Sequence, residues 1–188
     1  LGQMNEGAGQ IRAYSRLAFF HHYAAIRAAI VDANKRIRDP LAQERMMKSE
    51  VLKDQGLLAQ VEFQQPTNVY LVTSIAGGTG SGMLLDVGFL VKDVFQEGQV
   101  SICSFLVLPD HFGSVTNERM KANSYALLKE LNHYQYGVDN FEVEWNRGTT
   151  SRIPIPPFDY TYIFDNHNAS GQVTGGQPNS QELIFELL

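Results

Sequence analysis

The densest group of residues suited to chemistry is a glycine-rich stretch at positions 77–82, here called the glycine loop. It follows a short apolar run and precedes an amphipathic one. Glycine has no Cβ, so consecutive glycines let several backbone N–H groups converge on one anion. A helix that starts there adds free N–H groups and a positive dipole end. The candidate phosphate-binding residues are Gly77, Gly78, Thr79, Gly80, Ser81 and Gly82, with the two hydroxyls as extra donors.

Two common phosphate-binding motifs do not fit this stretch. A P-loop ends in Gly-Lys-Ser/Thr, and no lysine follows before Lys92. A dinucleotide fingerprint needs an acidic residue at the end of the next strand, which residues 100–108 lack. The alternative without a ligand is a glycine turn between a strand and a helix.

The remaining candidates for chemistry are weaker. His21 and His22 are adjacent and point to different sides of a helix, whereas a metal-binding pair needs i, i+4 spacing. The single cysteine, Cys103, excludes an internal disulfide and a Cys-based zinc site, and we expect it to be a buried apolar residue. We interpret His111 and His167 as exposed histidines. No catalytic and no metal-binding residue is assigned.

The elements around the glycine loop alternate in type. Residues 68–75 and 100–108 are apolar on both faces and predict strands buried within a parallel sheet. Residues 160–164 predict a third strand. A helix is predicted at 83–96, and another runs from an Asn117 cap to Tyr134.

The N-terminal part and the segment before the third strand complete this prediction. Residues 11–38 predict a long helix, and residues 41–55 predict a second, more charged one. Residues 137–157 read as irregular, with a hairpin near Gly148 and with Trp145 packing the segment. The face of the long helix expected to be buried comprises Leu17, Phe20, Ala24, Ala28 and Val31.

Alternating strands and helices predict an α/β fold with a parallel sheet flanked by helices. Ligands bind at the carboxyl ends of the strands in such sheets. The glycine loop and the loops at 109–116 and 165–168 all follow a predicted strand. We therefore expect one ligand site built from three loops.

Composition limits the class of protein. With 188 residues, 44% of them hydrophobic, the chain suits a single globular domain. A net charge of −5 argues against a nucleic-acid partner. No run is long enough for a membrane span and no leader is seen, so we expect a cytoplasmic protein without a membrane partner. The chain starts at Leu1 and stops within an apolar-periodic stretch at 181–188, so we expect it to be part of a longer protein.

The motifs together resemble the tubulin/FtsZ family of GTPases. Gly-Gly-Thr-Gly-Ser-Gly after an apolar strand is similar to the tubulin signature, and residues 104–109 (SFLVLP) resemble the strand before the family's ribose loop. Gly7-Ala8-Gly9 before a helix is similar to a second phosphate loop of the family. Ile163-Phe164-Asp165-Asn166 resembles the family's strand that ends in Asp-Asn.

The resemblance implies a Rossmann-like nucleotide-binding domain that takes GTP or GDP, with Mg²⁺ accompanying GTP and no protein ligand assigned to it. Gly7, Ala8 and Gly9 would approach the terminal phosphate. Glu118 would bond the ribose, and Asn166 would read the guanine edge. For each of these the alternative is local: a helix-entry turn, a first-turn glutamate or an Asx turn.

The chain also departs from the family pattern. The family's first phosphate loop would precede Leu1, and its water-activating acidic loop would follow residue 188, so neither is present. The longer helices at 11–55 and the inserted segment at 137–157 suggest a divergent bacterial branch. We expect the intact parent to hydrolyse GTP and to self-assemble into a homopolymer through longitudinal contacts. We expect this chain alone to be inactive. Alternatives are a non-hydrolysing scaffold and an unrelated α/β enzyme that binds another phosphorylated ligand.

Overall fold

A three-stranded parallel sheet forms the centre of the molecule. The computed structural model describes residues 8–47, 66–95, 99–137 and 140–165. The strands are β1 (Thr67–Ser74), β2 (Val100–Val107) and β5 (Tyr160–Phe164), in the order β1-β2-β5. Both pairings are parallel. The predicted α/β class, the three strands and the parallel sheet are therefore confirmed.

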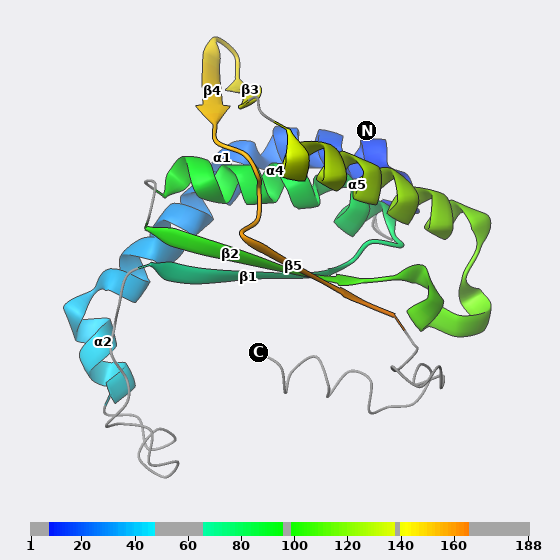
Figure 1. Ribbon diagram of the computed structural model, residues 1–188. Coiled ribbons are helices and arrows are strands. Elements are labelled where there is room, and N and C mark those ends of the chain that lie inside the picture. Colours follow the sequence, from blue (N-terminus) through cyan, green and yellow to red (C-terminus); the bar gives the residue numbers. More distant parts are fainter. Residues whose placement is uncertain (1–7, 48–65, 96–98, 138–139, 166–188) are drawn as a thin grey trace.

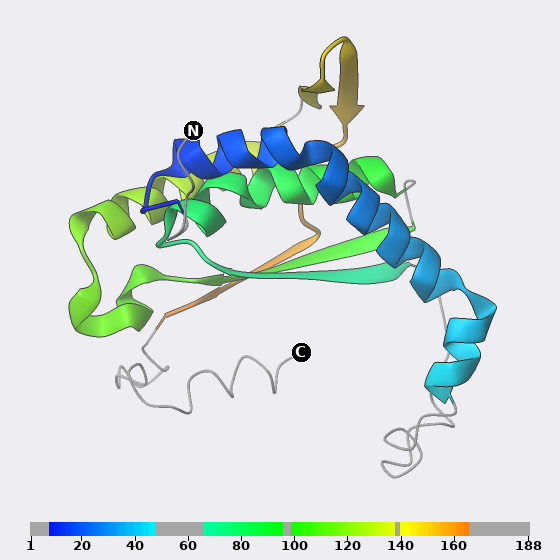
Figure 2. The same cartoon turned by 180° about the vertical axis from the view of Figure 1, so that it is seen from behind.

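Three helices lie over the same face of this sheet (Figures 1 and 2). They are α1 (Arg12–Arg38), α4 (Gly78–Val94), which connects β1 to β2, and α5 (Glu118–Tyr136). A short 3-10 helix, η2 (Pro109–Val115), joins β2 to α5. Helix α2 (Pro40–Met47) follows α1 and lies away from the sheet (Figure 1).

The core lies between the sheet and these helices. Ile102 and Leu106 of β2 pack against Phe89 of α4 and Leu127 of α5, and all four are fully buried. Burying a side chain of this size stabilises the fold by roughly 1.5–3 kcal/mol. The predicted cap of α5 is confirmed, since Asn117 Oδ1 accepts a hydrogen bond of 3.1 Å from the Met120 amide.

Helix α4 begins five residues earlier than predicted, at Gly78 instead of residue 83. Glycine has a low helix propensity, which favoured a loop there. Close packing explains the difference: a Cβ on Gly78 would lie 2.5 Å from the Ile11 nitrogen, and one on Gly82 would lie 2.0 Å from Ser15 Oγ. On Gly80 it would lie 2.0 Å from the Ser74 oxygen. Three of the four glycines thus permit close contact with α1 or β1.

The buried face of α1 differs from the predicted one. Ser15, Phe19 and Tyr23 are the buried residues, whereas Leu17 is half exposed. Ala24 and Ala28 are exposed as well. Phe20 of the predicted face does pack against the core, but the first turn of α1 meets glycines of α4, against which a serine fits. Further along, aromatic rings provide the contact.

The other face of the sheet is not covered by any helix in the described part of the chain (Figure 1). Tyr70, Tyr160 and Tyr162 are each at least half exposed there. The expectation that both faces of the strands are buried is therefore not met by the described residues. Cys103, expected to be buried, has intermediate exposure.

Residues expected to be irregular form a two-stranded antiparallel hairpin of β3 (Phe141–Asn146) and β4 (Thr149–Ile153). Gly148 has a positive φ of 81° at its turn, as the predicted hairpin requires. Trp145 stacks on Tyr23 with ring centroids 5.5 Å apart. The predicted packing role of Trp145 is thus confirmed. None of the helices in the described ranges has the length and apolar character to cross a bilayer.

Candidate functional site

A pocket of about 820 Å³ lies at the carboxyl end of β1. The parallel register brings the ends of β1, β2 and β5 to one edge of the sheet. The pocket is lined by residues 8–10, the end of β1, residues 76–80, Phe112 of η2 and the first turn of α5. Two of the three predicted ligand loops therefore meet in one cavity, joined by the N-terminal turn.

Unpaired backbone amides of α4 border this pocket. Gly77 is the N-cap of α4, with φ −80° and ψ 167°. The first bond within the helix runs from the Ser81 amide to the Gly77 oxygen, at 3.4 Å. The amides of Gly78, Thr79 and Gly80 donate to no other group in the described part of the chain. Three free donors and the positive end of a 17-residue helix are suited to an anion.

The other two residues of the glycine loop face away from the pocket. Ser81 is buried, and its hydroxyl donates to the Gly77 oxygen at 2.5 Å. Gly82 packs against Arg12 and Ser15 of α1. The structure therefore brings Gly77, Gly78, Thr79 and Gly80 to the pocket and uses Ser81 and Gly82 in the contact with α1.

The N-terminal turn forms a second wall of the pocket. Ala8 and Gly9 line it, while Gly7 lies outside the described residues. Gly9 has a φ of 54°. The side chain of Asn123 holds this turn in place, since its Nδ2 donates to the Gln10 oxygen at 3.0 Å and to the Ala76 oxygen at 3.1 Å.

Sequence reasoning missed Asn123, although a signal was present. It lies three residues after Met120 and four before Leu127, on the buried face of α5. A buried amide requires hydrogen-bond partners. The neighbouring Ser124 acts similarly, because its hydroxyl donates to the Ile75 oxygen at 3.1 Å.

The structure describes one of the two residues expected to hold ribose and base. The Glu118 side chain is 91% exposed, and its Oε1 lies 3.2 Å from Lys121 Nζ. Glu118 does not line the pocket. Asn166 lies outside the described residues.

Arg119 lines the pocket in the first turn of α5 and was not predicted. It makes no ion pair with another described residue. Cations are unfavourable at a helix N-terminus, because the dipole there is positive. An arginine in a first turn, next to a predicted ligand loop, was therefore a signal in the sequence for a nearby anion.

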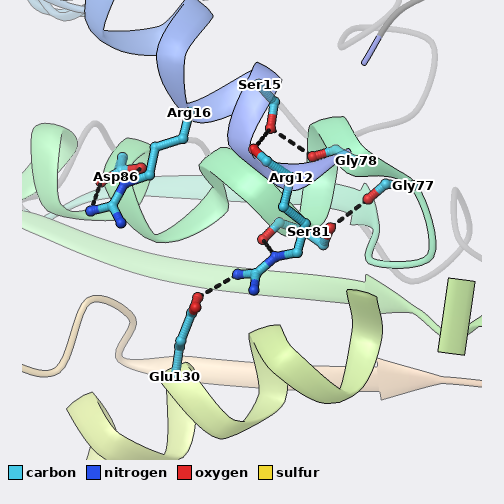
Figure 3. Close-up of polar contacts among 8 residues, drawn as sticks. All are labelled: Arg12, Ser15, Arg16, Gly77, Gly78, Ser81, Asp86 and Glu130. Carbon is cyan, nitrogen blue, oxygen red and sulfur yellow. Dashed lines mark hydrogen bonds and ion pairs between the residues drawn. The ribbon is translucent and has the colours of Figure 1, made fainter. Parts of the chain in front are cut away.

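A set of paired charges connects α1, α4 and α5 behind the glycine loop (Figure 3). Arg12 pairs with Glu130, and Arg16 Nε lies 3.2 Å from Asp86 Oδ2. These residues line a second cavity of about 340 Å³. Burial raises the pKa of Asp86 from 3.8 to about 6, although the neighbouring Arg16 opposes the rise. Within the described ranges, no three His, Cys, Asp or Glu side chains converge as a metal site.

Comparisons with known proteins gave one finding. A family model described as "Tubulin like" matches residues 1–184. Neither the curated proteins nor the solved structures gave a match.

Proposed function

We propose that this chain, which belongs to the tubulin-like family, binds the phosphates of a guanine nucleotide in the pocket at the carboxyl end of β1. One observation carries the proposal. The amides of Gly78, Thr79 and Gly80, which have no partner among the described residues, border the same cavity as the N-terminal turn. Backbone donors fixed in advance stabilise an anion without a reorganisation cost.

Each wall of the pocket has its own role in this proposal. The first turn of α4 donates hydrogen bonds to phosphate oxygens, and Thr79, which is exposed at the pocket, adds a hydroxyl. Ala8 and Gly9 bring a second stretch of backbone to the terminal phosphate. Arg119 supplies a positive charge at a third side. GTP or GDP is the ligand that the family suggests.

We propose GTP hydrolysis and self-assembly as the further activities that the family suggests for this nucleotide site. Mg²⁺ bound with GTP would supply positive charge to the phosphates, and no side chain of the described residues is assigned to hold it. The chain's own residues bind and orient the phosphates. Glu118 and Asn166 remain the proposed contacts to ribose and guanine.

One observation favours a second candidate, a non-hydrolysing scaffold for self-assembly or partner binding. Gly78, Gly80 and Gly82 are each required by close packing. The glycine pattern can therefore serve the fold without nucleotide turnover.

Substitution of Gly77 tests the binding site. A Cβ there meets no atom within 4 Å and the backbone angles suit alanine, so Gly77→Ala should fold normally while placing a methyl group at the pocket. We expect the Kd for GTP, measured by calorimetry, to rise about tenfold, the equivalent of about 1.4 kcal/mol. Unchanged affinity would place the site elsewhere.

Gly80→Ala is the contrasting variant. Its Cβ would collide with the Ser74 oxygen, so we expect lower thermal stability together with weaker binding. Competition of GTP with ATP and with a sugar phosphate then tests the base. Equal affinity for all three would favour the unrelated phosphate-binding enzyme over a guanine-nucleotide site.

A further inference from the structure

Arg12 connects the three helices next to the phosphate pocket (Figure 3). It is the first residue of α1 and follows the turn that carries Ala8 and Gly9. Its Nε donates to the Ser81 oxygen of α4 at 3.0 Å, and its Nη2 pairs with Glu130 of α5. A planar guanidinium can make both contacts at once because its donors are fixed in a fork.

The first turns of α1 and α4 are packed too closely to move independently. Ser15 Oγ lies 2.6 Å from the Gly78 oxygen and 2.8 Å from the Arg12 oxygen. A Cβ on Gly78 would lie 2.5 Å from the Ile11 nitrogen. The position of the α1 start relative to α4 therefore sets the separation of two pocket walls, the N-terminal turn and the free amides.

We propose that Arg12 is a positioning residue for the phosphate pocket. It holds the start of α1 against the first turn of α4 by bonding Ser81, and the pair with Glu130 fixes its guanidinium. The inference rests on the proposed function, since it concerns the geometry of that site. The hydrogen bond to Ser81 is partly buried, whereas Glu130 is 46% exposed, so solvent screens the ion pair more than the bond to Ser81.

Arg16 provides a matched control. It lies one turn further along α1 and pairs with a carboxylate of α4. Like Arg12, it lines the second cavity and not the phosphate pocket. Its partner Asp86 lies beyond the first turn of α4. Arg16→Met therefore removes an arginine–carboxylate contact between the same two helices without releasing the first turn of α4.

The test compares Arg12→Met, Arg12→Lys and Arg16→Met in the full chain. Nitrogen-15 NMR follows the amides of Gly9, Gly78, Thr79 and Gly80 without ligand, and calorimetry gives the Kd for GTP. We expect the four amide signals to shift in Arg12→Met and its Kd to rise about fivefold, less than for the loss of a direct charged hydrogen bond, because Arg12 does not contact the ligand. Arg12→Lys should recover part of the affinity, since lysine keeps the charge. Arg16→Met should lower the melting temperature without changing either readout.

Two results would overturn the inference. One is unshifted amide signals in Arg12→Met. The other is a Kd change in both methionine variants that is proportional to each variant's loss of stability, because such a result shows a merely structural role for Arg12. A wild-type chain that binds no GTP contradicts the proposed function instead, and the ligand-free amide signals still decide the role of Arg12.

Discussion

Arg119 is the one charged side chain that the described structure brings to the phosphate pocket. Because it lies at the positive end of α5, an anion beside it relieves an unfavourable charge–dipole contact. We expect Arg119→Gln to weaken GTP binding by about 1.5–3 kcal/mol, the usual value of a charged hydrogen bond. Titration calorimetry at low salt measures this.

The control for Arg119 is Lys129→Gln, further along α5. Lys129 is exposed and does not line the pocket. Its loss changes the net charge by the same amount, so it corrects for long-range attraction. If both variants weaken binding equally, Arg119 acts only through the overall field and makes no contact.

Asp86 gives the fold a pH dependence. Its pKa is about 6 in the folded chain and 3.8 in the reference state, because burial outweighs the pairing with Arg16. The folded chain therefore keeps a proton that the unfolded chain releases between about pH 4 and pH 6. Over that window the free energy of unfolding falls as pH rises, by up to about 3 kcal/mol.

Asp86→Asn removes this titration with almost no change in shape. We expect the variant to lose the contribution of Asp86 to the pH dependence between about pH 4 and pH 6. At pH 7 it should be as stable as wild type or more stable, since it avoids a buried carboxylate. Urea denaturation at pH 4.5 and pH 7 measures both. A variant that is clearly less stable at pH 7 would show that the charged pair with Arg16 stabilises the fold.

Residues of the candidate pocket could be predicted only where backbone chemistry demanded a residue type. The glycine loop is such a case, since residues 77–80 line the pocket, but its binding of phosphate stays a prediction. Ser81 has the right chemistry for phosphate, but the helix turns its hydroxyl towards the Gly77 oxygen. That orientation depends on where α4 begins. The low helix propensity of glycine led to a predicted start at residue 83 instead of Gly78.

At the scale of elements, apolar runs and caps predicted the order of strands and helices. Asn117 and the strand at residues 160–164 are placed as expected. The contact between α1 and α4 was not predictable, because it uses Gly78, Gly82 and Ser15 in place of an aliphatic stripe. Hydrophobic periodicity detects the burial of large side chains. It does not detect contacts in which two helices approach closely because glycine has no side chain.

The hairpin of β3 and β4 depends on Trp145. This side chain is 3% exposed and contacts the rings of Phe19, Phe20 and Tyr23 on α1. We expect Trp145→Ala to lower the free energy of unfolding by about 3–5 kcal/mol. Thermal and chemical denaturation measure the loss. Binding of GTP to the folded fraction should be unchanged, because Trp145 does not line the phosphate pocket.

Trp145→Phe distinguishes ring packing from the indole N–H. In the described structure Trp145 Nε1 is buried without an acceptor, which costs free energy. Phenylalanine keeps an aromatic ring and removes that donor, so we expect a clearly smaller loss than for alanine. Equal losses would show that indole size, and not aromatic contact, holds the hairpin.

At the scale of the whole molecule, helices on one face of the sheet leave aromatic residues on the other. Tyr162 stacks on Phe105 with ring centroids 5.3 Å apart, yet it remains half exposed. The sequence predicted strands buried on both faces, which is typical of parallel sheets. The sequence could not predict which face of the sheet the described helices would cover, because the strands are apolar on both faces.

Ligand binding should stabilise the whole molecule, because the pocket joins the N-terminal turn, β1, α4, η2 and α5. A ligand that binds only the folded chain adds RT ln(1 + [L]/Kd), or about 2.7 kcal/mol at one hundred times Kd. For a chain of this length that corresponds to a rise in melting temperature of about 5–10 °C.

A thermal-shift series with GTP, GDP and ATP tests this linkage on the wild-type chain and on Gly77→Ala. We expect the melting temperature to rise with the logarithm of GTP concentration once GTP exceeds Kd. The curve for Gly77→Ala should move to about tenfold higher concentration, while its melting temperature without ligand stays at the wild-type value. Because Gly77 contributes no side-chain contact to the fold, a displaced curve with an unchanged starting point can only come from the pocket. A melting temperature that does not respond to GTP would instead leave the glycine-rich start of α4 as a packing device.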